Sequence, residues 1–160
     1  MRAILPGRPQ ARLQAVTTGL WDGKQIIAYI SGSALIVLDG PNHILQTTYH
    51  EEEEDLGSVA FDEASGKIAT CYGATVLVYQ PYGQEEGAVK WQLQCQFSLQ
   101  DKMDSVETLS WGQDQELLVG SSSLTLFATH TTPEQLWAKP LANRPKFANF
   151  SYDAGLIATT

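Results

Sequence analysis

The segment that decides the fold is FDEASGKIATCYGATVLVY, residues 61–79. It contains two short apolar runs, 68–72 and 75–79, and only Gly73 and Ala74 lie between them. Runs this short, rich in β-branched and aromatic residues and joined by a tight turn, predict neighbouring antiparallel strands rather than a helix. Comparable runs separated by Gly, Asn, Asp, Ser and Pro occur along most of the chain, at residues 59–61, 91–99, 106–111, 116–119 and 124–127. The pattern is typical of an all-β protein.

An internal repeat connects these runs. Four times along the chain, a large apolar residue stands seven residues before an aliphatic one. The four pairs are Leu20 with Ile27, Phe61 with Ile68, Trp111 with Leu118 and Phe150 with Ile157. The large residues, which we call anchors, are 41, 50 and 39 residues apart, and the longest interval contains a glycine-rich insertion at 82–88. Spacings of about 40–45 residues with four strands per repeat are those of WD-type β-propeller blades.

The repeat divides the chain into units 17–56, 57–104, 105–145 and an incomplete unit 146–160. Each complete unit should be a four-stranded antiparallel blade. Because propellers have roughly 4–8 blades, three units and a fraction cannot close a ring. The predicted fold is therefore all-β, a partial WD-repeat-type β-propeller of about three and a half blades. We expect it to form the N-terminal part of a larger protein.

The repeat also predicts where individual residues lie. The aliphatic members Ile27, Ile68, Leu118 and Ile157 should occupy equivalent positions in the second strand of each unit. Small residues or valine follow them, so we expect this second strand to run beside the central channel, where the blades converge. The anchors Phe61 and Trp111 should be buried between adjacent blades.

The composition indicates a globular protein that does not bind nucleic acid. Hydrophobic residues make up 43% of the chain and charged residues 18%. With 18 Asp and Glu against 10 Lys and Arg, the net charge is −8 and the sequence pI is near 4.7. Nucleic acids and anionic membranes require clustered Lys and Arg, and the sequence has no such cluster. Five carboxylates form the run 51–55, which we interpret as a solvated loop, with contact to a basic protein partner as the alternative.

Cysteine usage and the N-terminus point to the cytoplasm. Cys71 and Cys95 are too few for a disulfide scaffold, and their separation matches no zinc spacing, so we expect buried, reduced thiols. The first sixteen residues contain no apolar stretch of the kind that a secretory signal needs. The longest apolar runs, 26–30 and 34–38, are far shorter than the roughly 20 residues of a membrane-spanning helix.

No set of residues predicts catalysis. His43, His50 and His130 are far apart and lack the i, i+4 spacing of a helical zinc site, so we interpret them as loop histidines. The three serines after Gly120 lack the Gly-Lys-Ser/Thr of a phosphate-binding loop. We assign no catalytic, cofactor-binding or metal-binding residue, and the partner-binding residues stay unknown.

Two of the four tryptophans are candidates for a contact surface. Trp111 takes an anchor position of the repeat and is expected in the core. Trp21 and Trp137 have no such position, so we consider them candidates for binding a partner.

The order of several segments carries a resemblance to a known family. After the opening Leu5-Pro6-Gly7-Arg8-Pro9, these segments are AYISG (28–32), LIVL (35–38), LQTTY (45–49), KIA (67–69), VLVYQP (76–81), KW (90–91), LSW (109–111) and LVGS (118–121). In this order they resemble the N-terminal region of the large subunit of the RAVE complex, whose animal counterparts are the DmX-like or rabconnectin proteins. The Leu-Pro-Gly-Arg-Pro opening is similar to that of the fungal members. The units lack the Gly-His and Trp-Asp pairs of familiar WD repeats.

The resemblance implies a large non-catalytic scaffold with paired WD-repeat propellers in its N-terminal half. Its complex promotes assembly of the peripheral and membrane sectors of the vacuolar proton-pumping ATPase after glucose returns. The implied partners are peripheral-sector subunits, the smaller RAVE subunit and a Skp-type adaptor. The implied location is the cytoplasm, with peripheral recruitment to vacuolar or endosomal membranes through these partners.

Two other functions remain open from the residues themselves. One is a generic WD-repeat adaptor, in coat assembly or in a ubiquitin ligase. The other is a propeller hydrolase, which would require Asp, Glu, His or Arg side chains that converge at the mouth of the channel.

Overall fold

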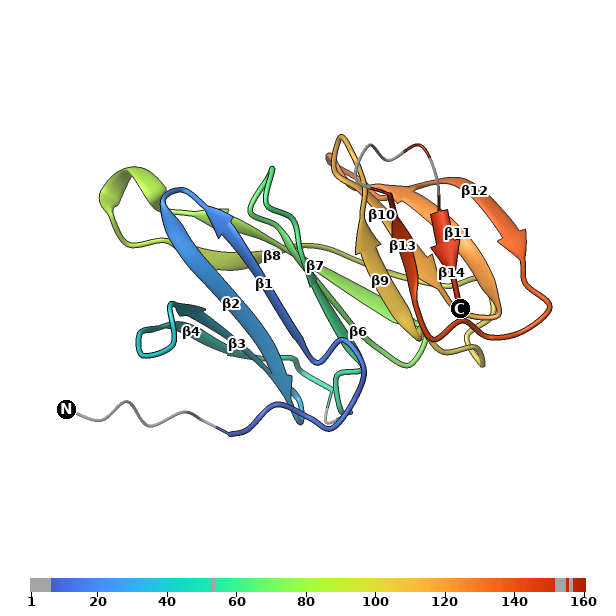
Figure 1. Ribbon diagram of the computed structural model, residues 1–160, viewed down its shortest axis with the longest axis horizontal. Helices are drawn as coiled ribbons and strands as arrows, with labels where there is room; N and C mark the ends of the chain where they lie inside the picture. The colour runs from blue at the N-terminus through green and yellow to red at the C-terminus, as the bar shows by residue number, and fades with distance from the viewer. Residues whose placement is uncertain (1–6, 53, 152–154, 156) are drawn as a thin grey trace.

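The computed structural model describes residues 7–52, 54–151, 155 and 157–160 (Figure 1). Leu5 and Pro6 of the opening motif and Glu53 of the acidic run lie outside the described residues. The described part contains three four-stranded antiparallel sheets and one two-stranded sheet, which follow one another along the chain. The all-β prediction is confirmed.

Within each sheet the strands pair in sequence order. Sheet 1 contains β1 (Val16–Trp21), β2 (Lys24–Ser31), β3 (Ala34–Asp39) and β4 (Ile44–Tyr49). Sheet 2 contains β5 (Ser58–Phe61), β6 (Ile68–Tyr72), β7 (Thr75–Tyr82) and β8 (Lys90–Ser98). Sheet 3 contains β9 (Thr108–Trp111), β10 (Glu116–Gly120), β11 (Ser123–Ala128) and β12 (Glu134–Pro140). Sheet 4 contains β13 (Ala148–Phe150) and β14 (Ile157–Thr159).

Short turns allow this sequential pairing. The turn between β1 and β2 consists of Asp22 and Gly23, with φ of 50° and 70°. Two-residue hairpins of this kind need positive φ at both positions, which Asp and Gly tolerate better than most residues. The insertion between β7 and β8 contains the 3₁₀ turn η1 (Gln84–Glu86), flanked by Gly83 and Gly87 in the left-handed conformation. The insertion thus leaves the sheet unchanged and lies in a loop, as its composition predicts.

The first strand of each sheet lies innermost. β1 packs beside β5, β5 beside β9, and β9 beside β13, so these four strands line one axis. The expectation that the second strand runs beside the channel is therefore wrong. The small residues that suggested it, Ala28 and Ala69, are fully buried because β2 and β6 lie inside their sheets and face a neighbouring sheet. Close packing between sheets restricts side-chain size as much as a narrow channel would.

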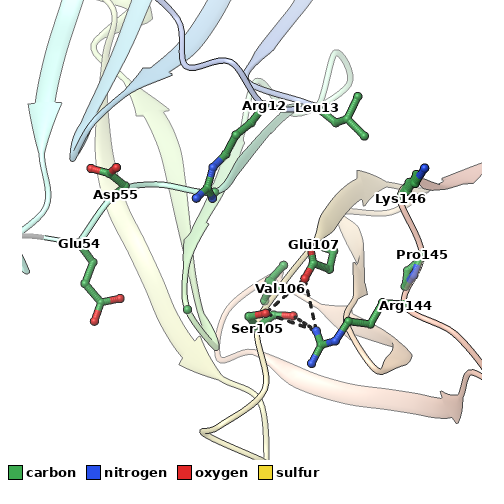
Figure 2. A pocket seen from close by; sticks show the side chains of 12 residues that line it. Arg12, Leu13, Glu54, Asp55, Ser105, Val106, Glu107, Arg144, Pro145 and Lys146 are labelled. Atoms are coloured by element: carbon green, nitrogen blue, oxygen red, sulfur yellow. Dashed lines mark hydrogen bonds and ion pairs between the residues drawn. The ribbon is translucent and has the colours of Figure 1, made fainter.

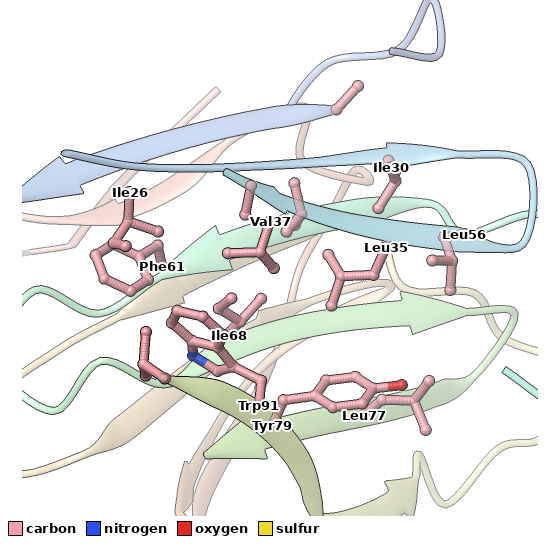
Figure 3. Packing of buried hydrophobic residues seen from close by; sticks show 14 residues of the cluster. Ile26, Ile30, Leu35, Val37, Leu56, Phe61, Ile68, Leu77, Tyr79 and Trp91 are labelled. Atoms are coloured by element: carbon pink, nitrogen blue, oxygen red, sulfur yellow. The ribbon is translucent and has the colours of Figure 1, made fainter. Parts of the chain in front are cut away.

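The largest apolar cluster lies between sheets 1 and 2. Ile26, Ile30 and Leu35 of sheet 1 meet Phe61 and Ile68 of sheet 2 (Figure 3). Full burial of one such side chain stabilises the fold by about 1.5–3 kcal/mol. A second cluster joins sheets 2 and 3 through Cys71, Val119 and the tilted ring pair Phe97–Phe127, whose centroids are 4.4 Å apart. The two faces of sheet 2 are therefore both buried, which explains its nearly continuous hydrophobic strands.

The anchors contact the first strand of the preceding sheet. A Cβ on Gly19 would lie 2.7 Å from the Phe61 ring, and a Cβ on Gly112 would lie 2.8 Å from the Phe150 ring. The Trp111 indole donates a hydrogen bond of 3.1 Å to the Ala60 carbonyl. Phe61 is buried as predicted, whereas Trp111 is only partly buried against the second cluster. Leu20, by contrast, is 71% exposed on a face of β1 that no described sheet covers.

The predicted pairing of each anchor with its aliphatic residue is right in sheets 2 and 4 and wrong in sheets 1 and 3. In sheet 1, Leu20 pairs with Gln25 and Ile27 pairs with Thr18, because the turn between β1 and β2 has only two residues. Ile68 pairs with Phe61 and Ile157 with Phe150, and these residues face the preceding sheet. Leu118 lies in the equivalent strand, but Trp111 pairs with Leu117, and Leu118 faces sheet 4 instead. The prediction for Leu118 is therefore wrong by one residue, because the turn between β9 and β10 is one residue shorter. A shift of one residue moves a side chain to the opposite face of a sheet.

Candidate partner-binding site at the channel mouth

The four inner strands begin at the same end of the molecule. The segments that lead into them therefore converge there and surround a cavity of about 1040 Å³, which we call the channel mouth. The lining comes from the segments that precede β1, β5, β9 and β13 and from the turn between β6 and β7 (Figure 2). The lining residues are Arg12, Leu13, Glu54, Asp55, Gly57, Gly73, Ser105, Val106, Glu107, Arg144, Pro145 and Lys146.

Charges of both signs border the channel mouth. Glu54 and Asp55, which end the acidic run, lie on one side, and Arg144 and Lys146 lie on the other (Figure 2). All four are exposed. Arg12 projects between the two sides. A surface of this kind suits recognition of a protein partner with its own pattern of charges, since complementary potentials guide association and reject wrong partners.

Arg144 is tied to the wall of the channel mouth. Its Nη2 lies 2.6 Å from Asp104 Oδ1, and its Nη1 lies 3.4 Å from Glu107 Oε1. Asp104 also accepts hydrogen bonds from the backbone N–H and the hydroxyl of Ser122. Burial by itself would raise the pKa of Asp104, but the hydrogen bonds from Ser122, Ser105, Ser121 and Arg144 hold it well below the usual range. The carboxylate therefore stays ionised and fixes the guanidinium.

Gln14 lies at the start of the innermost strands and connects three sheets. Its Oε1 accepts hydrogen bonds from Ser58 Oγ (2.8 Å), Thr108 Oγ1 (2.9 Å) and the backbone N–H of Leu109 (3.2 Å). Its own carbonyl accepts one from the N–H of Val59. The residue has a φ of 56°, which glutamine rarely adopts. Sequence reasoning missed Gln14, because nothing in its neighbourhood distinguishes it from a loop glutamine.

A buried lysine was missed for the same reason. Lys67 is 5% exposed, and its Nζ donates a 2.7 Å hydrogen bond to the carbonyl of Thr129. Burial lowers its pKa, and the nearby Cys95 and Asp62 counteract this. Lys67 thus joins sheet 2 to the end of β11 in sheet 3. Its position inside the short KIA segment suggested only a strand.

The histidines and the buried cysteine Cys71 lie in separate environments. His43 and His130 are exposed, and His50 is half-buried with its ring stacked on Tyr72. Burial raises the pKa of the Cys71 thiol to about 12, which makes it a poor nucleophile. Among residues 7–52, 54–151, 155 and 157–160, no group of three or more His, Cys, Asp or Glu could hold a metal ion. Within the described part of the chain, no helix is long and apolar enough to span a membrane.

The two tryptophans proposed for a contact surface differ in environment. Trp21 packs against the cluster between sheets 1 and 2, with its ring 6.0 Å from that of Trp91. It is therefore partly buried within the fold, and its role as a contact residue stays a prediction. Trp137 is 38% exposed on β12, a strand whose seven residues are all exposed. It remains available for contact with another protein.

Comparison with curated proteins gives two fungal relatives. The Regulator of V-ATPase in vacuolar membrane protein 1 of Saccharomyces cerevisiae is 36% identical over 124 residues, which are 78% of this chain. The protein of the same name from Schizosaccharomyces pombe is 26% identical over 157 residues, which are 96% of this chain. The chain spans only 9% and 12% of their respective lengths. No protein-family profile matches the chain.

Comparison with solved structures shows the fold. The β-propeller domain of Cps50 (Swd1) from Myceliophteria thermophila matches with a TM-score of 0.67 at 8% identity, over 90% of this chain and 50% of that chain. A chain of the Mitotic Checkpoint Complex matches with a TM-score of 0.69 at 12% identity, over 91% of this chain and 45% of that chain. The four sheets are therefore blades of a partial β-propeller, as the repeat predicts.

Proposed function

Because the chain belongs to the family of the fungal regulators of V-ATPase in the vacuolar membrane, we propose that it is part of a non-catalytic scaffold for assembly of this proton pump. The observation that carries the proposal is the 36% identity to the Saccharomyces cerevisiae regulator across 78% of the chain, combined with the propeller fold. A propeller offers a rigid frame on which loops from several blades present one composite surface.

The partners of this scaffold are proteins. They are peripheral-sector subunits of the ATPase, the smaller subunit of the RAVE complex and a Skp-type adaptor. The protein acts from the cytoplasm and reaches vacuolar or endosomal membranes through these partners. The exposed charges of both signs at the channel mouth support this mode of action, because they can complement the charges of a protein surface.

Loss of the protein tests the function directly. In a fungal strain from which it is deleted, the peripheral sector should fail to rejoin vacuolar membranes after glucose is withdrawn and restored. Reintroducing the wild-type protein should restore co-sedimentation of the two sectors and vacuolar acidification. Normal reassembly in the deletion strain would overturn the proposal.

Charge reversal tests whether the channel mouth contributes. The double variant Glu54→Lys/Asp55→Lys should reduce co-purification of peripheral-sector subunits, since both carboxylates border the channel mouth and are exposed. The matched control is Glu85→Lys/Glu86→Lys, which makes the same charge change on η1, away from the channel mouth. Equal co-purification by both variants would place the binding surface elsewhere on the protein.

A further inference from the structure

A second cavity, which we call the side pocket, lies between the outer parts of sheets 1 and 2. The sheets diverge outward from the channel, and a paired contact closes the gap at one point. There the side-chain amide of Gln46 donates to the Trp91 carbonyl (2.8 Å) and accepts from the Trp91 N–H (2.7 Å). Beyond this closure the side pocket, about 350 Å³ in volume, runs along the end of β4 beside β7 and β8. This size is in the range of pockets that hold a small ligand or a large side chain.

Aromatic rings form the wall of the side pocket. The His50 imidazole stacks on the Tyr72 ring with a centroid separation of 4.6 Å and an angle of 9° between the planes. Tyr79 and Trp91 also line the side pocket, but they are 5% and 3% exposed and belong to the core cluster between sheets 1 and 2. His50 Nε2 bonds to the Glu54 carbonyl, and the Tyr72 hydroxyl accepts a hydrogen bond of 3.4 Å from Gln96. The partly exposed His50–Tyr72 pair is therefore the aromatic surface that the side pocket offers to a guest.

One atom of this wall lacks a partner. His50 Nδ1 is buried and makes no hydrogen bond to any described residue. Since Nε2 faces a carbonyl oxygen, which can only accept, Nε2 carries the hydrogen, and in the neutral ring Nδ1 is then an acceptor. A buried acceptor without a partner costs free energy. A guest that donates hydrogen bonds and reaches this atom would supply the missing partner.

The charges around the side pocket select a cation. Glu51 and Glu52 line it and are exposed, and no Lys or Arg is among its lining residues. Tyr49 and Leu93, which are 64% and 49% exposed, provide apolar surface at its rim. A guest with a flat cationic group, several donors and apolar neighbours matches all of these features. The arginine guanidinium has this chemistry, because it stacks on aromatic rings and pairs with carboxylates.

We propose that the side pocket binds an arginine side chain from an extended segment of a partner protein. The guanidinium lies against the aromatic wall and pairs with Glu51 and Glu52, while residues on either side of the arginine contact Tyr49 and Leu93. This binding site goes beyond the scaffold function and does not depend on which assembly the protein serves.

A labelled peptide tests the proposal. Fluorescence anisotropy of the intact protein would compare fluorescein-labelled Ser-Val-Arg-Val-Ser with the same peptide carrying citrulline, a neutral isostere of arginine. The arginine peptide should bind about tenfold more tightly, since only it offers a cation to the rings and carboxylates. Equal behaviour of the two peptides, including no binding by either, would overturn the proposal.

Paired variants locate the binding. Glu51→Gln/Glu52→Gln should lower affinity for the arginine peptide several-fold and leave the citrulline peptide unaffected. Glu85→Gln/Glu86→Gln removes the same charge from exposed residues of η1 and should leave both affinities unchanged. Tyr49→Ser, at an exposed rim position, should weaken both peptides equally because it removes apolar contact only. If the two charge-removing variants behave alike, the arginine peptide is attracted by net charge and the side pocket is not its site.

Discussion

At the scale of single residues, a few polar side chains hold the blades together where apolar packing ends. Gln14 is the clearest case, because one amide oxygen serves Ser58, Thr108 and the Leu109 N–H at once. The Gln14→Ala variant should lower the free energy of unfolding by about 2 kcal/mol, since it leaves two buried hydroxyls unsatisfied. Urea denaturation of the intact protein, followed by tryptophan fluorescence, measures this. Gln92→Ala, on the exposed face of β8, is the control, and an equal loss there would contradict the role of Gln14.

Asp104 should make stability depend on pH. Because folding lowers the pKa of Asp104, its contribution is present above the ordinary carboxyl pKa of about 3.9 and is lost as pH falls through the folded value. The Asp104→Asn variant should therefore be less stable at pH 7 and lose less stability on acidification below about pH 4. Thermal unfolding across a pH series measures both effects. Parallel stability curves for variant and wild type would show that the Asp104–Arg144 contact is not the titrating element.

At the scale of elements, the turn between β5 and β6 depends on a glycine for two reasons. Gly66 has a φ of +76°, and a Cβ there would lie 2.4 Å from the Trp21 ring. Its carbonyl also accepts the hydrogen bond of the Trp91 indole. Gly66→Ala should therefore destabilise the protein by more than about 2 kcal/mol, through backbone strain and displacement of Trp21.

Gly87→Ala separates these two causes. Gly87 has a φ of +72°, but a Cβ there would meet nothing within 4 Å. It should cost only about 1 kcal/mol, the strain of a left-handed residue with a side chain. The difference between the denaturation midpoints of the two variants then reports the contact with Trp21. Equal midpoints would mean that Trp21 moves aside without cost.

At the scale of the whole molecule, the chain is an open array of blades. The matching solved propellers are about twice as long as the aligned part, which covers 50% and 45% of them. The exposed Val16 and Leu20 of β1 lie on the first blade, which has no described neighbour on one face. The seven exposed residues of β12, with Leu136 and Trp137, form the outer strand of sheet 3, whose neighbour sheet 4 has only two described strands. Exposed apolar surface of this kind calls for a covering partner.

The 160-residue chain, expressed alone, should self-associate, and analytical ultracentrifugation should show species larger than a monomer. A monomer that unfolds cooperatively would contradict this.

The sequence by itself determined the class of fold and its repeat. Short β-rich runs, tight turns and an anchor spacing near 40 residues predicted the four successive sheets, because strand periodicity and turn chemistry are local properties of the chain. The same reasoning failed by one residue at Leu118. The turn after Trp111 is one residue shorter, so the Leu118 side chain lies on the opposite face of its sheet from the one predicted. The sequence reasoning also predicted that the second strand is the innermost one. The alanines that follow Ile27 and Ile68 indicate that the space around them is restricted, but they do not show whether the channel or a neighbouring sheet restricts it.

Only the tertiary structure decided which distant residues meet. Gln14 reaches Thr108 across 94 positions, and Lys67 reaches Thr129 across 62. The side pocket exists because the end of β4 faces β7 and β8, which places His50 of one blade on Tyr72 of the next. These contacts depend on how the blades are arranged about a common axis. Residues far apart in the sequence can form them, because the entropic cost of closing a loop rises only slowly with the length of the loop. Local patterns determine what each segment becomes, whereas the packing of the blades determines which polar and aromatic groups share a site.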